Sequence, residues 1–263
     1  MIKTLKKLIK IIPGIGALTA SSISFAQLDK EQQWQQVYDA RTAFYEQHIG
    51  ALPADIMKSP SLFVVWPAGG FYVIPADKIA KGLWAYTSFG LSNVDMPANM
   101  KATNVQLEYD DQGRVTSSSA TLENKNPQMT VPETAGYGYE VLLITKENEE
   151  WPLWFLQWFA NAELSNDAGI LNRVEEYNGL TVEAIQVGEN SEDQINVLIT
   201  KAQQPLPTGI QLPNGKMEFL VAIVITDEEM QWSMEHGRDA LLQKLMKSGI
   251  GQVSDRHRAS VVK

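Results

Sequence analysis

Side chains that catalyse reactions or bind metals are scarce in this sequence. It contains three histidines, His48, His236 and His257, and no cysteine. No two histidines have the spacing of a helical zinc motif, and without cysteine there is no thiol nucleophile and no thiolate metal site. The serine-nucleophile motif Gly-x-Ser-x-Gly and the phosphate-binding P-loop are also missing. We therefore predict no catalytic residue, no metal-binding residue and no cofactor.

Carboxylates offer the one catalytic alternative. Glu140 lies in a predicted strand beside Gly136 and Gly138, where a buried carboxyl group with a shifted pKa can act as a general acid. An ion-paired or solvent-facing structural role is the commoner use of such a residue. Asp110 and Asp111 lie in a predicted hairpin turn and lack the spacing of a calcium-binding EF-hand loop. The turn interpretation is therefore favoured for those two residues.

The stretch from Glu133 to Glu163 predicts the centre of the fold. Residues alternate in polarity from Tyr137 to Leu143, which is typical of a strand. Pro152 suits the first turn of a following helix, and this helix carries leucines and tryptophans at helical spacing. The tryptophans are Trp151, Trp154 and Trp158. Core packing is the favoured interpretation of these rings, and an aromatic platform for carbohydrate or peptide is the alternative.

Periodicity and turn residues predict the remaining elements. An amphipathic helix spans Lys30–His48, where the histidine suits the last turn. A capping box at Thr226 opens a helix that runs to about Lys247, and Gly237 weakens its middle. Ala168–Gly179 lacks a regular pattern. Strands are predicted at Ser61–Trp66, Phe71–Ile74, Leu83–Ser92, Thr103–Tyr109, Arg114–Leu122, Thr181–Val187, Gln194–Thr200 and Lys216–Thr226, the last being the best candidate for a central strand.

Residues 1–26 have the pattern of a secretory signal peptide. Four lysines precede a mostly apolar run, and Ser24, Phe25 and Ala26 form a small-x-small cleavage site. The run, Ile11–Ile23, is short for a stable membrane span, and a retained N-terminal anchor is the alternative. We predict cleavage after Ala26 and a periplasmic or secreted protein.

Charge and length restrict the class of partner. The formal net charge is −9, and loss of the four leader lysines changes it to −13. Such acidity opposes nucleic-acid binding, which depends on lysine and arginine neutralising phosphates, and it favours a basic protein partner. The 237 residues after Ala26 are enough for one hydrophobic core without disulfides. The sequence predicts no particular oligomeric state.

Four sequence blocks, together with the end of the chain, resemble the suppressor of fused domain family. The blocks occur in the family's order, and the resemblance covers about Ser61 to Ser260. The matches are Trp84–Ser92 (WAYTSFGLS) to W-x-Y-x-S-x-G-L-S; Gly136–Glu140 (GYGYE) to G-F-G-F-E; Trp151–Gln157 (WPLWFLQ) to W-P-x-x-x-x-Q; Asn214–Leu220 with Ile225–Glu229 to G-x-x-x-F-L and T-x-E-E; and Asp255, Arg256 and Ser260 to a closing D-R-x-S.

This resemblance implies an α+β fold with a mixed β-sheet and packed helices. It places one suppressor-of-fused-like domain at residues 61–263, after an N-terminal helix and connector at residues 27–60. It also implies a protein-binding module and not an enzyme. For bacterial members it implies an immunity-like role, in which the domain neutralises a toxin of a competing strain.

The resemblance also suggests binding residues. In animal members an acidic residue shortly before the G-F-G-F-E strand helps to hold a bound peptide. Here Glu133 lies nearby at a displaced position, and Ala85 replaces a histidine that is frequent in the first block. The candidate binding residues are Tyr86, Asp95, Glu133, Tyr137 and Glu140.

Two other functions stay open at this stage. One is a periplasmic hydrolase or carbohydrate-binding protein, which would use exposed aromatic rings and the carboxylates of Glu140, Asp110 and Asp111. The other is a structural envelope protein whose acidic surface keeps it in solution.

Overall fold

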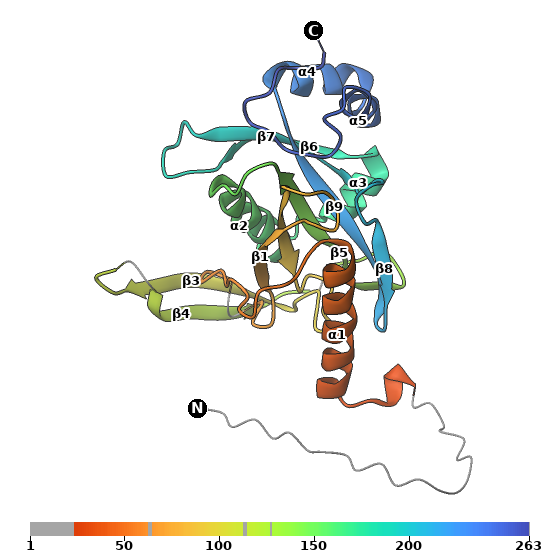
Figure 1. The fold of residues 1–263 in the computed structure, drawn as a ribbon. Helices are drawn as coiled ribbons and strands as arrows, with labels where there is room; N and C mark the ends of the chain where they lie inside the picture. Colours follow the sequence, from red (N-terminus) through yellow and green to blue (C-terminus); the bar gives the residue numbers. More distant parts are fainter. Residues whose placement is uncertain (1–23, 63–64, 113–114, 127, 263) are drawn as a thin grey trace, which may run out of the picture.

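The computed structural model describes residues 24–62, 65–112, 115–126 and 128–262 (Figure 1). The predicted leader lies outside these ranges up to residue 23. Among the described residues, no helix combines the length and the apolar character that crossing a membrane requires.

A seven-stranded mixed sheet forms the centre of the molecule (Figure 1). Its strands are β1 (Gly70–Pro75), β2 (Trp84–Phe89), β5 (Thr134–Thr145), β6 (Leu180–Gln186), β7 (Gln194–Lys201), β8 (Gly209–Leu212) and β9 (Gly215–Ile225). The order is β1-β2-β5-β9-β7-β6, and β8 pairs with the first part of β9. β5 and β9 are parallel, whereas the other neighbours are antiparallel. The predicted α+β class with one mixed sheet is confirmed.

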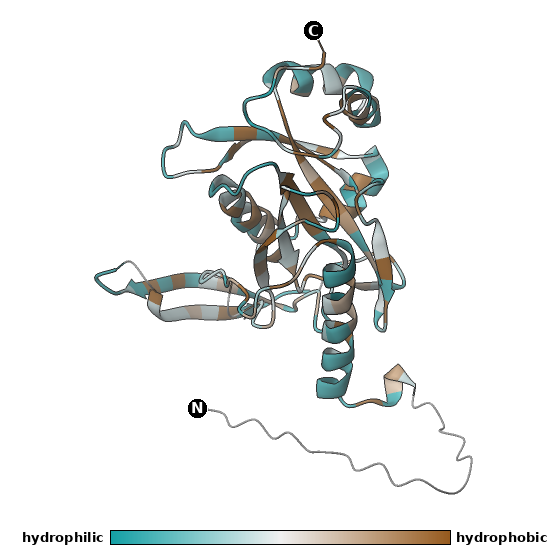
Figure 2. Cartoon of the chain, in the orientation of Figure 1, coloured by the Kyte–Doolittle hydropathy of each residue, from teal (hydrophilic) through white to brown (hydrophobic). Residues whose placement is uncertain are grey.

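Helices cover both faces of this sheet, because its central strands are apolar on both sides. α2 (Trp151–Leu164) and α3 (Ile170–Tyr177) share a core with Tyr139, Val141 and Leu143 of β5. α1 (Lys30–His48), α4 (Asp227–His236) and α5 (Arg238–Lys247) share the opposite core with Leu142 and Ile144. Successive residues of β5 therefore serve opposite cores, as side-chain alternation in a strand requires. Figure 2 shows the hydrophobic colour concentrated on these inner strands.

Local sequence signals fix the helix ends. Asp29 caps α1 by accepting a hydrogen bond from the Gln32 backbone N–H at 2.8 Å. Pro152 lies in the first turn of α2, as predicted. Thr226 and Glu229 form the predicted capping box at the start of α4.

A separate two-stranded sheet, the predicted hairpin, extends away from the body (Figure 1). It consists of β3 (Met100–Tyr109) and β4 (Val115–Asn124). Most side chains of both strands are exposed, including those of Val105, Tyr109 and Leu122. The hairpin therefore adds little to either core.

The structure corrects the sequence prediction in four places. The described residues of Ser61–Trp66 form turns and no strand, because the Trp66 N–H donates to the Leu62 carbonyl oxygen at 2.8 Å and both side chains are buried. The sequence prediction also lacks α3 and the short strand β8. Finally, the single helix predicted from Thr226 to about Lys247 is two helices, because Gly237, with φ of 96°, ends α4.

Replacing Gly237 with alanine is expected to lower the free energy of unfolding by about 1–3 kcal/mol, because few residues other than glycine tolerate this backbone conformation. Its φ and ψ are 96° and 153°, and an added Cβ would lie 2.9 Å from Oδ1 of Asp239. Equilibrium urea unfolding followed by circular dichroism measures the change. Unchanged or increased stability would contradict the helix break.

Candidate functional site

Glu140 is completely buried in β5, and four donors hold its carboxylate. Ser88 Oγ donates to Oε2 at 2.6 Å. Ser92 Oγ donates to Oε1 at 2.7 Å, and the backbone N–H groups of Gly90 and Ser92 donate to the same oxygen at 2.8 and 3.0 Å. These bonds fasten the end of β2 and the turn that follows it onto β5.

Arg41 of α1 is the positive charge beside this carboxylate. Its Nη1 lies 3.6 Å from Glu140 Oε1, and both side chains are fully buried. Nη1 donates to Ser92 Oγ at 2.8 Å, and Nη2 donates to Asn93 Oδ1 at 2.7 Å. The guanidinium also lies 4.1 Å from the ring centroid of Phe89. Burial lowers the pKa of Arg41, and the charge of Glu140 opposes that lowering.

These contacts explain the residue types of the WAYTSFGLS block. Ser88 and Ser92 supply the hydroxyl donors, and Gly90, with φ of 124°, permits the turn that brings both beside Glu140. The sequence analysis did not identify Arg41 as the partner of Glu140. The available signal was a charged residue on the apolar face of an amphipathic helix.

Two further candidate residues are also buried: Tyr86 is 0% exposed and Tyr137 is 3% exposed. The Tyr86 hydroxyl donates to Asn148 Oδ1 at 2.8 Å and accepts from the Glu149 backbone N–H at 2.6 Å. Burial raises the pKa of both phenols, so both stay neutral near pH 7. A role of these side chains in binding would require the fold to open, and it stays a prediction.

Asp95 and Glu133 are exposed and lie on two segments that pack together. Gly136, with φ of 57°, allows this packing, because an added Cβ would lie 2.4 Å from the Leu91 carbonyl oxygen and 3.0 Å from Met96 Cβ. The chain that enters β5 therefore lies against the loop that carries Asp95. Both carboxylates are accessible to a partner, and their role in binding stays a prediction.

The tryptophans of α2 are mostly part of the core. Trp151 is 6% exposed, and Trp158 is half-buried against the same core. Trp154 is the exposed member, at 38%. The favoured prediction, core packing, is confirmed for Trp151 and Trp158.

The carboxylates of the hydrolase alternative are not brought together. Asp110 and Asp111 lie at the turn of the projecting hairpin, whereas Glu140 is buried inside the body. Among the residues that the structure describes, no group of three or more histidine, aspartate or glutamate side chains is arranged to hold a metal ion.

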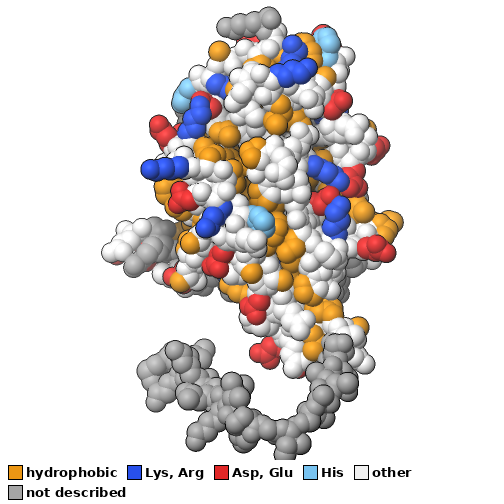
Figure 3. Space-filling view, turned by 45° about the vertical axis from the view of Figure 1, so that its right-hand side comes forward, with side chains coloured by type: hydrophobic (Ala, Val, Ile, Leu, Met, Phe, Trp, Pro, Cys, Tyr) orange, Lys and Arg blue, Asp and Glu red, His pale blue; other side chains and the backbone are white. Residues whose placement is uncertain are grey.

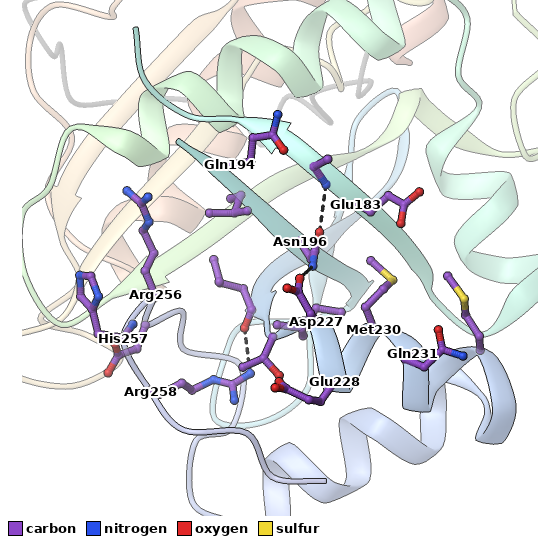
Figure 4. A pocket seen from close by; sticks show the side chains of 17 residues that line it. Glu183, Gln194, Asn196, Asp227, Glu228, Met230, Gln231, Arg256, His257 and Arg258 are labelled. Carbon is purple, nitrogen blue, oxygen red and sulfur yellow. Dashed lines mark hydrogen bonds between the residues drawn. The ribbon is translucent and has the colours of Figure 1, made fainter. Parts of the chain in front are cut away.

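A cavity of about 720 Å³ opens where α4 meets the sheet (Figure 4). We call it the α4 cleft. Its walls are the β6–β7 hairpin, the end of β9, α4 and the C-terminal tail. The wall residues include Glu183, Gln194 and Asn196 of the hairpin, Asp227, Glu228, Met230 and Met234 of α4, and Asp255, Arg256, His257 and Arg258 of the tail.

Two arginines hold the tail in place as a wall of the α4 cleft. Arg258 donates to both carboxylate oxygens of Glu229, at 2.6 and 2.5 Å, and the two side chains are 8% and 0% exposed. Glu229 also accepts from the Val261 backbone N–H at 2.9 Å. Arg256 forms an ion pair with Asp193 in the β6–β7 turn. Glu229, the third helical residue of the α4 capping box, therefore also holds the tail.

The contacts with the C-terminal tail change the pKa of Glu229. Burial on its own raises the pKa of this carboxyl group. Hydrogen bonds from Arg258 and from the backbone of Val261 and Thr226 outweigh burial, so the pKa lies below its ordinary value of 4.5. The carboxylate is therefore charged near neutral pH.

Comparisons with known proteins agree with this architecture. The sequence model of the suppressor of fused protein family matches residues 68–259. The fold is similar to that of a suppressor of fused homolog from Neisseria gonorrhoeae FA 1090, with a TM-score of 0.52, 16% identity, and coverage of 89% of this chain and 98% of that one. It is also similar to a chain of the Sufu–Fu complex, with a TM-score of 0.50, 17% identity, and coverage of 87% and 91%. No curated protein matches the chain by sequence.

The fold is of the α+β class: one mixed sheet forms its centre, and helices cover both faces of that sheet. The chain belongs to the suppressor of fused protein family, because the family's sequence model covers most of it. The resemblance carried by the sequence blocks is thereby confirmed.

Replacing Arg41 with methionine is expected to lower the free energy of unfolding by about 3–5 kcal/mol, because Glu140 is left as an unpaired buried charge. Lys30→Met, at the exposed start of the same helix, is the matched control and should change it by less than about 0.5 kcal/mol. Urea unfolding measures both. Equal effects of the two substitutions would contradict the role given to Arg41.

Stability is expected to fall in acid as Glu229 takes up a proton. Its folded-state pKa is below the ordinary value of 4.5, so its contribution is complete above that value and is lost as the pH falls through the folded-state pKa. Glu229→Gln should be less stable at pH 7 and should lose less stability on acidification. Thermal unfolding between about pH 3 and pH 7 tests this expectation. Parallel pH profiles would refute it.

Proposed function

We propose that this chain is an exported protein-binding module, not an enzyme, and that its partner is a basic protein. The observation that carries the proposal is its membership of the suppressor of fused family over residues 68–259. A structural neighbour is part of the Sufu–Fu complex, so that protein binds another protein. The binding function is extended to this chain by family.

The use of its residues supports this function. The strongest candidate for a catalytic residue, Glu140, is buried, and its carboxylate accepts four hydrogen bonds and lies beside Arg41. Other carboxylates, including Asp95 and Glu133, lie at the surface, where they attract a basic partner. In Figure 3, hydrophobic side chains form a band down the middle of one face, with most charged side chains along its sides. Apolar surface rimmed by charge is typical of protein contact sites.

The proposal includes a location and a division of the chain. A leader at residues 1–26, cleaved after Ala26, would deliver the protein to the periplasm or the medium. Residues 27–60 would be an N-terminal helix and connector, and residues 61–263 the family domain. Within that division, Arg41 bonds the helix to Ser92 and Asn93 of the domain.

An immunity-like role is the specific form of binding that we propose. A toxin from a competing strain would meet an exported protein before it meets its target. Many nucleases and membrane-active toxins must engage polyanions, which requires a basic surface. An acidic module with net charge −13 after loss of the leader would attract such a surface.

A pull-down with the immobilised chain from Gln27 to Lys263 tests this function. Envelope and secreted fractions of the source cells and of competing strains are applied at about 50 and 300 mM salt, because salt screens charge attraction. We expect one stoichiometric basic protein that is retained at low salt and weakened at high salt. An unrelated acidic protein of similar net charge is the control. Retention of nothing beyond what the control retains would contradict the function.

A further inference from the structure

Acidic side chains outnumber arginines in the α4 cleft. Four carboxylates line it: Glu183 of β6, Asp227 and Glu228 of α4, and Asp255 of the tail. The tail supplies two arginines, but both are already paired, Arg256 with Asp193 and Arg258 with Glu229. An excess of one charge around a cavity concentrates ligands of the opposite charge.

One amide side chain joins the two acidic walls. β6 has a bulge at Glu183 and Ala184, which lie opposite the single residue Asn196. Ala184, with φ of 55°, donates its N–H to Asn196 Oδ1 at 2.9 Å. Asn196 Nδ2 donates in turn to Asp227 Oδ1 at 2.6 Å (Figure 4). The bulge that carries Glu183 is therefore fixed relative to the start of α4.

The cleft offers groups that match both parts of a lysine or arginine side chain. Within the described part of the chain, the carboxylate of Glu183 has no hydrogen-bond or ion-pair partner. Met234 is 60% exposed on the α4 wall, beside the buried Met230. A thioether packs adaptably against aliphatic groups, and lysine and arginine carry a charged head on an aliphatic stem.

We propose that the α4 cleft docks a basic, extended segment of the protein partner. Lysine or arginine heads lie at Glu183 and Asp227, and their stems lie over Met234. The proposal rests on the binding function proposed above and adds the surface and the chemistry of the partner. A cavity of about 720 Å³ holds a few such side chains, and its negative walls disfavour anionic ligands.

A fluorescent nona-arginine peptide is the probe that tests this surface. Anisotropy titration of the protein should show saturable binding that weakens with salt, and a nona-glutamate peptide should not bind. Glu183→Lys should weaken nona-arginine binding about tenfold, because it places a like charge at the bulge. Met234→Ala, which keeps the charge, should weaken it by a smaller factor. Circular dichroism confirms that both variants fold.

Glu46→Lys is the matched control, because it makes the same change of charge on the exposed surface of α1, away from α4 in Figure 1. It should leave the affinity within about twofold. Equal weakening by both substitutions would overturn the proposal, because attraction would then be diffuse. Absence of saturable nona-arginine binding at low salt would overturn it as well.

The cleft and the function can fail separately. If the protein retained in the pull-down binds Glu183→Lys as tightly as the unaltered chain, the cleft proposal is wrong and the binding function stands. If nona-arginine occupies the cleft but no fraction yields a partner, the function is contradicted and the cleft is only a cation-binding surface.

Discussion

The pairing of Arg41 with Glu140 is the constraint on which the rest of the structure depends. Two opposite charges are removed completely from water, which is costly unless every remaining donor and acceptor finds a partner. Ser88, Gly90 and Ser92 donate to Glu140, and Ser92 and Asn93 accept from the terminal nitrogens of Arg41. Arg41 Nε and Asn93 Nδ2 stay without a hydrogen-bond partner in the described part of the chain, so part of the cost of burial remains. One interaction therefore joins the first helix, the end of β2 and the central strand β5. Glu140, the strongest candidate for a catalytic carboxylate in the sequence, therefore has a structural role.

The sequence predicts the elements whose apolar periodicity is long and uninterrupted. α1, β5, α2 and β9 satisfy that condition, and the hairpin around Asp110 has a clear turn signal. Prediction from the sequence fails where the types of neighbouring residues do not determine the local structure. α3 is a helix of only eight residues between two left-handed residues, Gly169 and Asn178. Its apolar residues lie on one face, but it is shorter than the stretch over which helical periodicity is recognised. Gly237 separates two helices because of its backbone conformation, whereas its type alone indicates only a weaker helix.

The candidate site is less predictable, because it depends on contacts between distant residues. The Arg41 side chain bonds to Ser92, 51 positions away, and no local pattern specifies that choice. The α4 cleft combines β6, β7, α4 and the tail, which only the fold brings together. A partial signal is present in the sequence: residues 180–200 and α4 lack lysine and arginine while each carries four carboxylates. Local charge of this kind indicates an acidic surface. The bulge at Ala184, which positions Glu183 on that surface, appears only in the structure.

The buried carboxylate of Glu140 stabilises the fold, and we propose that the surface carboxylates bind a partner protein. Hydrogen exchange measured by mass spectrometry, on the protein alone and on its complex with the protein retained from the pull-down, tests it most directly. We predict slower exchange on binding in residues 180–196 and 226–236, with no change in the already protected segment 137–143. Slower exchange confined to the β3–β4 hairpin or to the helix that carries Trp154, with the α4 cleft unchanged, would contradict the claim.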